Sequence, residues 1–179
     1  MSSAPVIVAP ANIGILGGGQ LGAMLCEAGR RMGYVMHVLS ESPEDPAARW
    51  ADRHVTGETN DPATVAAFAR TLDVLTNEFE QVPPEVLRAA EGLGTVRVAP
   101  SSGVQSVCRD RRHEKSLFAA HQFPHGPFAI VERAEEVEQG LTALPFVFGD
   151  QAAALQILGV NLDEFHVFIA MHDWVASAS

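Results

Sequence analysis

The chain has 179 residues, of which 47% are hydrophobic, and its mean hydropathy of +0.09 leaves ample material for a folded core. Lys and Arg number 12 against 22 Asp and Glu, and the net charge of -10 argues against nucleic acid and anionic membrane as partners. The first residues lack the basic and apolar stretches of a secretory signal, and no run approaches the roughly 18 apolar residues of a membrane span. We therefore expect a cytoplasmic protein of one domain, or of one domain and part of another.

The first predicted elements are a strand, a glycine turn and a helix. Residues 12–16, NIGIL, are typical of a buried strand, and glycines at 17, 19 and 22 have the spacing of a dinucleotide-binding turn. The helix begins at Gln20 and Leu21 and ends at Gly33. Its spacing places apolar side chains on one face, namely Leu21, Met24, Leu25, Ala28 and Met32.

Strands and helices continue to alternate as far as residue 100. Further strands are predicted at 34–40, 53–57, 73–80 and 96–100. A helix over 61–72 has Asp61 as its N-cap and Pro62 in its first position, and Pro83 and Pro84 open the next helix. This order predicts an α/β fold, with a five-stranded Rossmann-like parallel sheet over residues 1–100. Ligands of such sheets bind at the carboxyl ends of the strands, where the glycine turn and the acids after the fourth strand both lie.

A small α+β region is predicted after residue 100. One helix that ends near Gln122 carries a basic cluster, made of Arg109, Arg111, Arg112 and Lys115. A strand over 126–131 and a helix over 134–144 follow, and residues 166–171 are typical of a buried strand.

The end of the chain is acidic. No Lys or Arg follows Arg133, and residues 134–179 carry seven acids. His166, His172 and Asp173 have no metal-site spacing, so we expect no metal site here. Cys26 and Cys108 lie far apart and outside any CxxC pattern, so both are expected to be buried, reduced thiols.

The glycine turn by itself indicates an anion site without identifying the anion. Gly17 and Gly19 let backbone N–H groups approach a phosphate, and the helix N-terminus adds a partial positive charge. A dinucleotide site also needs an acid at the end of the second strand, where this chain has Ser40, with Glu41 next to it. Glycines needed only for a tight strand-to-helix turn are the alternative.

Four stretches resemble, in order and spacing, the N-terminal region of the N5-carboxyaminoimidazole ribonucleotide synthetase family of ATP-grasp enzymes. They are IGILGGGQLGAML, ADRHVTGETNDPATVAAFA, DVLTNEFEQVPPEVL, and RDRRHEKSLF followed by FPHGPFAIV. The resemblance covers about residues 12–145. It implies a pre-ATP-grasp domain over 1–100, the start of an ATP-grasp region over 101–145 and a divergent tail over 146–179. The implied activity is the carboxylation of aminoimidazole ribonucleotide with ATP and bicarbonate.

The resemblance also implies which residues face the ribonucleotide. They are Gly19, Gln20 and Leu21 in the turn, and Glu78 and Glu80 at the acidic strand end. Backbone N–H groups and an amide can hold polar substrate groups, and a carboxylate can accept hydrogen bonds from ribose hydroxyls or an exocyclic amine. Strand alternation puts both glutamates on one side. Solvated acids at a strand end are the alternative.

For ATP, the resemblance implies a basic helix near the phosphates, with Mg²⁺ in the intact family. Arg111 and Lys115 occupy the matching positions, four residues apart and so on one helical face. An ordinary charged face, with Asp110 and Glu114 as partners, is the alternative. The chain departs from the family at Ser40, where an Asp is usual, and at Asn77, where an aromatic residue is common.

Three functions remain open. Nothing after residue 145 matches the family's phosphate-binding and metal-binding residues, and phosphoryl transfer requires such groups. The first function is a ribonucleotide-binding relative that has no catalytic residues and no activity alone. The second is a regulatory or partner-binding pseudoenzyme that forms a homodimer or pairs with a full-length relative. The third is an NAD-binding oxidoreductase that uses Gly17, Gly19 and Gly22.

Overall fold

The computed structural model describes residues 6–79, 81–125, 128–130 and 168–170. The chain divides into two compact units, Met1–Arg109 and Asp110–Ser179. Within the described residues, the second unit has helix α5 (Arg111–Ala120) and an antiparallel pair of strands, β6 (Phe128–Ile130) and β7 (Phe168–Ala170). These strands confirm the ones predicted over 126–131 and 166–171.

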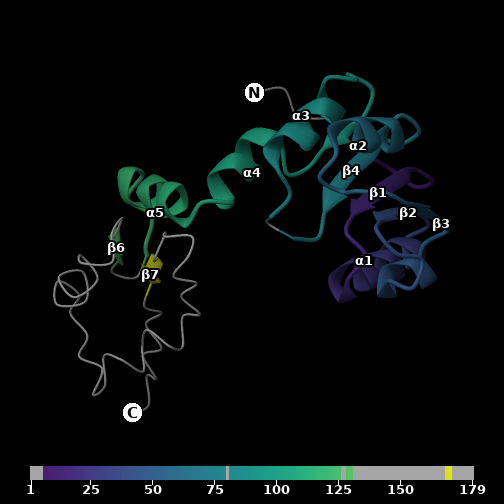
Figure 1. Cartoon of the computed structure of the whole chain (residues 1–179), viewed down its shortest axis with the longest axis horizontal. Coiled ribbons are helices and arrows are strands. Elements are labelled where there is room, and N and C mark those ends of the chain that lie inside the picture. Colours follow the sequence, from purple (N-terminus) through teal and green to yellow (C-terminus); the bar gives the residue numbers. More distant parts are fainter. Residues whose placement is uncertain (1–5, 80, 126–127, 131–167, 171–179) are drawn as a thin grey trace, which may run out of the picture. The chain divides into compact units, whose positions relative to one another are not determined.

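A five-stranded parallel sheet forms the centre of the first unit, as predicted (Figure 1). Its strands are β1 (Asn12–Leu16), β2 (Val35–Ser40), β3 (Arg53–Thr56), β4 (Val74–Asn77) and β5 (Arg97–Val98). Their order is β3-β2-β1-β4-β5, so the most apolar strand lies in the middle and the turn that follows it lies at the middle of the carboxyl edge.

Helices cover both faces of this sheet (Figure 1). On one face, α1 (Gln20–Arg31) and the 3-10 helix η1 (Pro46–Arg49) enclose a core that includes Ile15, Cys26 and Val38. On the other face, α2 (Pro62–Ala69) and α3 (Pro84–Glu91) enclose Leu39 and Leu75, and α4 (Ser102–Cys108) packs on α3.

The predicted helix starts in the first unit are confirmed. The Asp61 side chain accepts hydrogen bonds from the N–H groups of Ala63 and Thr64, and Pro62 is the first residue of α2. Helix α3 likewise begins at Pro84. Proline suits a first helical position because its missing N–H would have no partner inside the helix.

The apolar face predicted for the first helix is the exposed face of α1. Leu21 is 60% exposed and Met24 is 64% exposed. The buried residues are instead small ones, namely Gly22, Ala23, Cys26 and Gly29. A Cβ on Gly29 would collide with the sulfur of Met36 in β2, so only a face of small residues can approach the sheet this closely. Hydrophobic spacing by itself therefore indicated the wrong face.

The helix predicted to end near Gln122 is α5, which ends at Ala120, but it does not carry the whole basic cluster because a separate helix, α4, precedes it. Helix α4 ends at Cys108, and Asp110 starts α5 by accepting a 2.9 Å hydrogen bond from the N–H of Arg112. Capping by a short acidic side chain separates the two helices. The basic cluster is thereby divided, with Arg109 at the end of α4 and the other members on α5.

The two cysteines differ in exposure. Cys26 is buried, as expected, and burial is the largest of the effects that raise the pKa of its thiol to about 11. Cys108 is exposed, which corrects the expectation that both are buried. It is the last residue of α4, a helix whose buried residues are Ser102 and Gln105.

Other expectations concern the second unit, metal sites and membrane-spanning helices. The helix over 134–144, His166, His172 and Asp173 all lie outside the described residues. Among the residues that are described, no group of three or more His, Cys, Asp or Glu side chains could hold a metal ion. Within the same part of the chain, no helix is long and apolar enough to cross a membrane.

Candidate functional site

The carboxyl ends of β1, β2 and β4 meet beside the glycine turn. Leu16 is the register partner of both Leu39 in β2 and Asn77 in β4. Beyond the strand ends, the N–H of Gly17 donates a 3.0 Å hydrogen bond to the Leu39 carbonyl, and the N–H of Glu78 donates a 3.1 Å bond to the Leu16 carbonyl. Parallel register therefore brings Glu78 to the glycine turn.

The Glu78 carboxylate fills that turn. Its Oε1 accepts a 2.7 Å hydrogen bond from the N–H of Gly19, and its Oε2 accepts one from the N–H of Gly22. A Cβ at Gly17, Gly19 or Gly22 would lie 2.5, 2.7 or 2.6 Å from an atom of the Glu78 side chain. All three glycines of the motif thus surround one carboxylate, which takes the place that a phosphate takes in a dinucleotide-binding turn.

Asp45 and Ser40 pack against the remaining glycine of the turn. A Cβ on Gly18 would lie 2.5 Å from Asp45 Oδ2 and 2.7 Å from Ser40 Cβ. Ser40 is buried, and its Oγ lies 3.0 Å from His54 Nε2. The position of a ribose-binding acid is therefore held by a serine that is already hydrogen-bonded.

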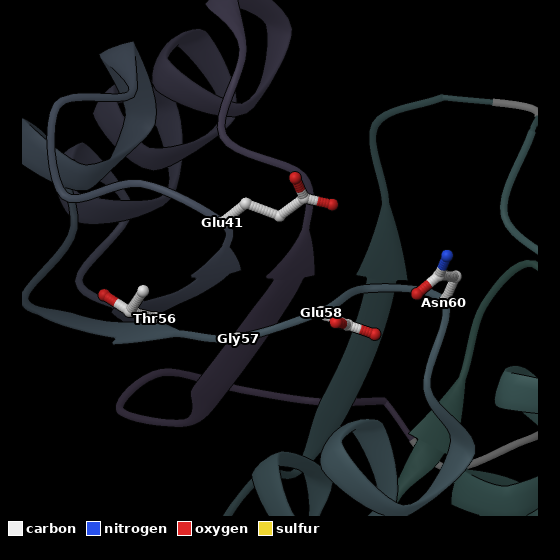
Figure 2. Close-up of a pocket in the computed structure, with 5 residues that line it drawn as sticks. All are labelled: Glu41, Thr56, Gly57, Glu58 and Asn60. Atoms are coloured by element: carbon white, nitrogen blue, oxygen red, sulfur yellow. The ribbon is translucent and has the colours of Figure 1, made fainter.

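An open cavity of about 430 Å³ is part of the same edge (Figure 2). It is lined by Glu41, Thr56, Gly57, Glu58 and Asn60. Figure 2 shows Glu41 directly after β2, and Glu58 and Asn60 in the loop that follows β3. Carboxylate, hydroxyl and amide oxygens accept hydrogen bonds, so the cavity suits ligands that carry N–H or O–H donors.

The structure places most of the predicted ribonucleotide contacts at this edge. Gln20 and Leu21 are the first two residues of α1, and both are exposed. Among the described residues, the Gln20 side chain has no hydrogen-bond partner. Glu78 is half-buried in the turn, and Glu80 lies outside the described residues.

Some groups at this edge were missed by the sequence analysis. They are Asp45, Glu58 and Asn60. The sequence feature that could have identified these residues is their position, because they follow strands that end at the same edge.

Arg111 and Lys115 belong to the second unit, on α5. Arg111 Nη1 lies 2.5 Å from Glu114 Oε2, and Lys115 Nζ lies 5.9 Å from the centre of the Phe118 ring. The hydrogen bond from the Arg112 side chain is the main reason that the pKa of Asp110 lies well below its usual range. Helix α5 therefore has the predicted basic face. The carboxylates that form ion pairs with this face include one on α5 itself and one on its N-cap residue.

Comparison with known proteins identifies relatives of the first unit. Residues 11–109 match the family model of the ribonucleotide synthetase preATP-grasp domain. The N5-carboxyaminoimidazole ribonucleotide synthase of Brucella melitensis is 37% identical over 134 residues, which are 74% of this chain and 36% of that protein. The enzyme of the same name from Aquifex aeolicus is 35% identical over 128 residues, or 71% and 32% of the two chains. The chain thus spans about a third of the length of these relatives.

Solved structures agree with this assignment. N5-carboxyaminoimidazole ribonucleotide synthetase from Thermus thermophilus superposes with a TM-score of 0.66 at 35% identity, covering 82% of this chain and 43% of that one. The Aspergillus clavatus synthase, solved with ADP and 5-aminoimidazole ribonucleotide, gives a TM-score of 0.65 at 28% identity and covers 76% and 37%.

Proposed function

Because the chain belongs to the ribonucleotide synthetase preATP-grasp family, we propose that its first unit is the ribonucleotide-binding part of an N5-carboxyaminoimidazole ribonucleotide synthetase. The observation that carries this proposal is the Glu78 carboxylate in the glycine turn. Its negative charge offsets the partial positive charge at the N-terminus of α1, so the turn has no free anion site for the pyrophosphate of NAD.

A ribonucleotide that bears an amine suits the acceptors of this edge. The ligand named for the Aspergillus clavatus structure, 5-aminoimidazole ribonucleotide, carries an exocyclic amine and ribose hydroxyls, which are hydrogen-bond donors. Glu78, Glu41 and Glu58 supply carboxylate acceptors, and Gln20 supplies an amide. Glu80, expected on the same side as Glu78, adds another acceptor in this proposal. The ribonucleotide phosphate would lie away from these carboxylates, because like charges repel.

In the same proposal, Arg111 and Lys115 bind ATP phosphates, and Mg²⁺ accompanies ATP in the intact enzyme. ADP and ATP complexes of solved relatives support a nucleotide in the family. Residues 134–179 carry no Lys or Arg, whereas phosphoryl transfer needs cations to neutralise developing negative charge. We therefore expect no ATP hydrolysis stimulated by aminoimidazole ribonucleotide from this chain alone.

Calorimetric titration of the 179-residue chain tests the proposal. Aminoimidazole ribonucleotide, ATP with Mg²⁺, and NAD are titrated in separate runs, and we expect the ribonucleotide to bind and NAD not to bind. Gln20→Ala should weaken ribonucleotide binding by about 1–3 kcal/mol if the amide is buried against the ligand. Arg70→Ala, an exposed change at the end of α2, is the matched control and should leave affinity unchanged.

Each other outcome has a definite meaning. NAD binding without ribonucleotide binding would restore the oxidoreductase alternative. If none of the three ligands binds, the glycine turn has only a structural role, and the partner-binding alternative is favoured. Robust ribonucleotide-stimulated ATP hydrolysis, with contamination excluded, would overturn the expected inactivity of the chain alone.

A further inference from the structure

A second cavity, of about 410 Å³, lies between β3 and α2. Its lining includes His37, Arg53, Val55, Thr64, Phe68 and Thr71, none of which lines the cavity of Figure 2 or lies against the glycines of the turn. Its volume falls in the range of small-molecule sites, roughly 300–1,000 Å³. The cavity is therefore large enough for a ligand and separate from the proposed ribonucleotide site.

His37 brings a buried hydrogen-bond acceptor to this cavity. The side chain is 4% exposed, and its Nε2 lies 3.1 Å from Asn12 Oδ1. Because Asn12 Nδ2 donates to Asp73 at 3.3 Å, its Oδ1 faces the imidazole, and Nε2 is the ring nitrogen that donates. Burial and the charge of Arg53 lower the pKa of His37, which agrees with a neutral ring. Nδ1 then has a lone pair, and it has no hydrogen-bond partner in the described part of the chain.

Arg53 brings a positive charge to the same cavity. It is the register partner of His37 on the neighbouring strand, so the two side chains share a face of the sheet. Within the described residues, Arg53 forms no ion pair. The adjacent carboxylate of Asp52 is engaged elsewhere, at 3.2 Å from Arg30 and 2.9 Å from the N–H of Met36. The Arg53 guanidinium is thus available to an acidic ligand.

We propose that this cavity binds a small organic acid that has an apolar body and one hydroxyl or N–H group. The carboxylate of the ligand pairs with Arg53, and its hydroxyl or N–H group donates to Nδ1 of His37. The apolar body packs against Phe68, which is 8% exposed, and against Val55, which is 42% exposed. A single cation and a mostly apolar wall match such an acid better than they match a nucleotide with several phosphate charges.

Titration of the 179-residue chain with benzoate, its three monohydroxy derivatives and phenol tests this proposal. Calorimetry measures affinity, and NMR follows the ring signals of His37. At least one hydroxybenzoate should bind more tightly than both benzoate and phenol and should shift those signals. Arg53→Gln should weaken its binding about tenfold or more. Arg97→Gln is the matched control, because Arg97 opens β5 at the other edge of the sheet, and should not change affinity.

A variant that fills the cavity tests the proposal without removing the charge of Arg53. Thr71 is exposed and lines the cavity, so Thr71→Phe should occupy the space and abolish binding while Arg53 and His37 remain. Absence of binding by all the acids at millimolar concentration would overturn the proposal. Equal affinities of wild type, Arg53→Gln and Thr71→Phe would also overturn it. No ribonucleotide is used, so this result is independent of the proposed function.

Discussion

The carboxylate of Glu78 accepts a 2.7 Å hydrogen bond from the backbone N–H of Gly19, so this glycine turn is filled by a side chain of its own protein. In dinucleotide-binding proteins the corresponding N–H groups point at a pyrophosphate. Glycine at these positions lets an anion approach the backbone closely, whether the anion belongs to a ligand or to the chain. The spacing of the glycines thus indicates an anion without identifying its source.

Removal of the Glu78 carboxylate should destabilise the first unit. In Glu78→Ala the N–H groups of Gly19 and Gly22 lose their acceptor, and we expect the free energy of unfolding to fall by about 1–3 kcal/mol. Glu78→Gln keeps one acceptor oxygen and should lose less. Chemical denaturation followed by circular dichroism measures both changes. Glu41→Ala, an exposed carboxylate at the same edge, should stay within about 0.5 kcal/mol of wild type, and a loss as large as that of Glu78→Ala would contradict this account.

A methyl group at Gly22 should also be costly. A Cβ there would lie 2.6 Å from Glu78 Oε2 and 3.1 Å from the carbonyl oxygen of Gly17, so Gly22→Ala should lower the free energy of unfolding by about 1–3 kcal/mol. Gly103→Ala in α4 is the matched control. Its Cβ meets nothing closer than 3.9 Å, and the change should stabilise the helix by up to about 1 kcal/mol. Denaturation curves with shifts of the same sign would contradict this prediction.

Thiol reactivity should distinguish the two cysteines. Cys108 is exposed, whereas Cys26 is buried and its pKa is raised to about 11, chiefly by burial, so little reactive thiolate forms. A disulfide reagent should modify one thiol per folded chain and both thiols in denaturant. Cys108→Ser should remove the fast reaction of the folded chain. If the folded variant reacts as fast as wild type, Cys26 is not in the core.

The stability of the first unit should fall as the solution becomes acidic. The pKa of His37 is lowered from its usual 6.5 by burial and then by Arg53, so the unfolded chain takes up this proton more readily than the folded chain does. The stabilising contribution of neutral His37 is complete above pH 6.5 and is lost as the pH falls toward and through the lowered pKa. Denaturation at several pH values between about 7 and 5 measures the slope of the free energy of unfolding against pH. His37→Gln should have a shallower slope than wild type, and equal slopes would show that another group controls it.

Local patterns were sufficient to predict the order of the elements in the first unit. Apolar runs predicted the five strands, and Asp61 with Pro62 predicted the start of α2, because capping and proline geometry act within one helical turn. The helix break at Asp110 was missed, although its side chain is a strong cap, because the basic residues around it are good helix formers.

The exposed face of α1 shows where local patterns fail. Spacing identified a stripe with Leu21 and Met24, but the face that packs on a sheet depends on how closely the two backbones approach. Here the approach is close, and the small residues around Gly29 meet Met36. That distance is a property of the packed layers and is absent from the helix sequence.

The sequence by itself determined the α/β order and the parallel sheet, because these follow from residue spacing along the chain, and its motifs were sufficient to identify the family. Only the tertiary structure decided what fills the glycine turn. Gly19 and Glu78 are 59 positions apart, and the parallel register of β1 and β4 brings them together. A contact between residues so distant in sequence depends on how the whole sheet is assembled, so no local motif could have specified it.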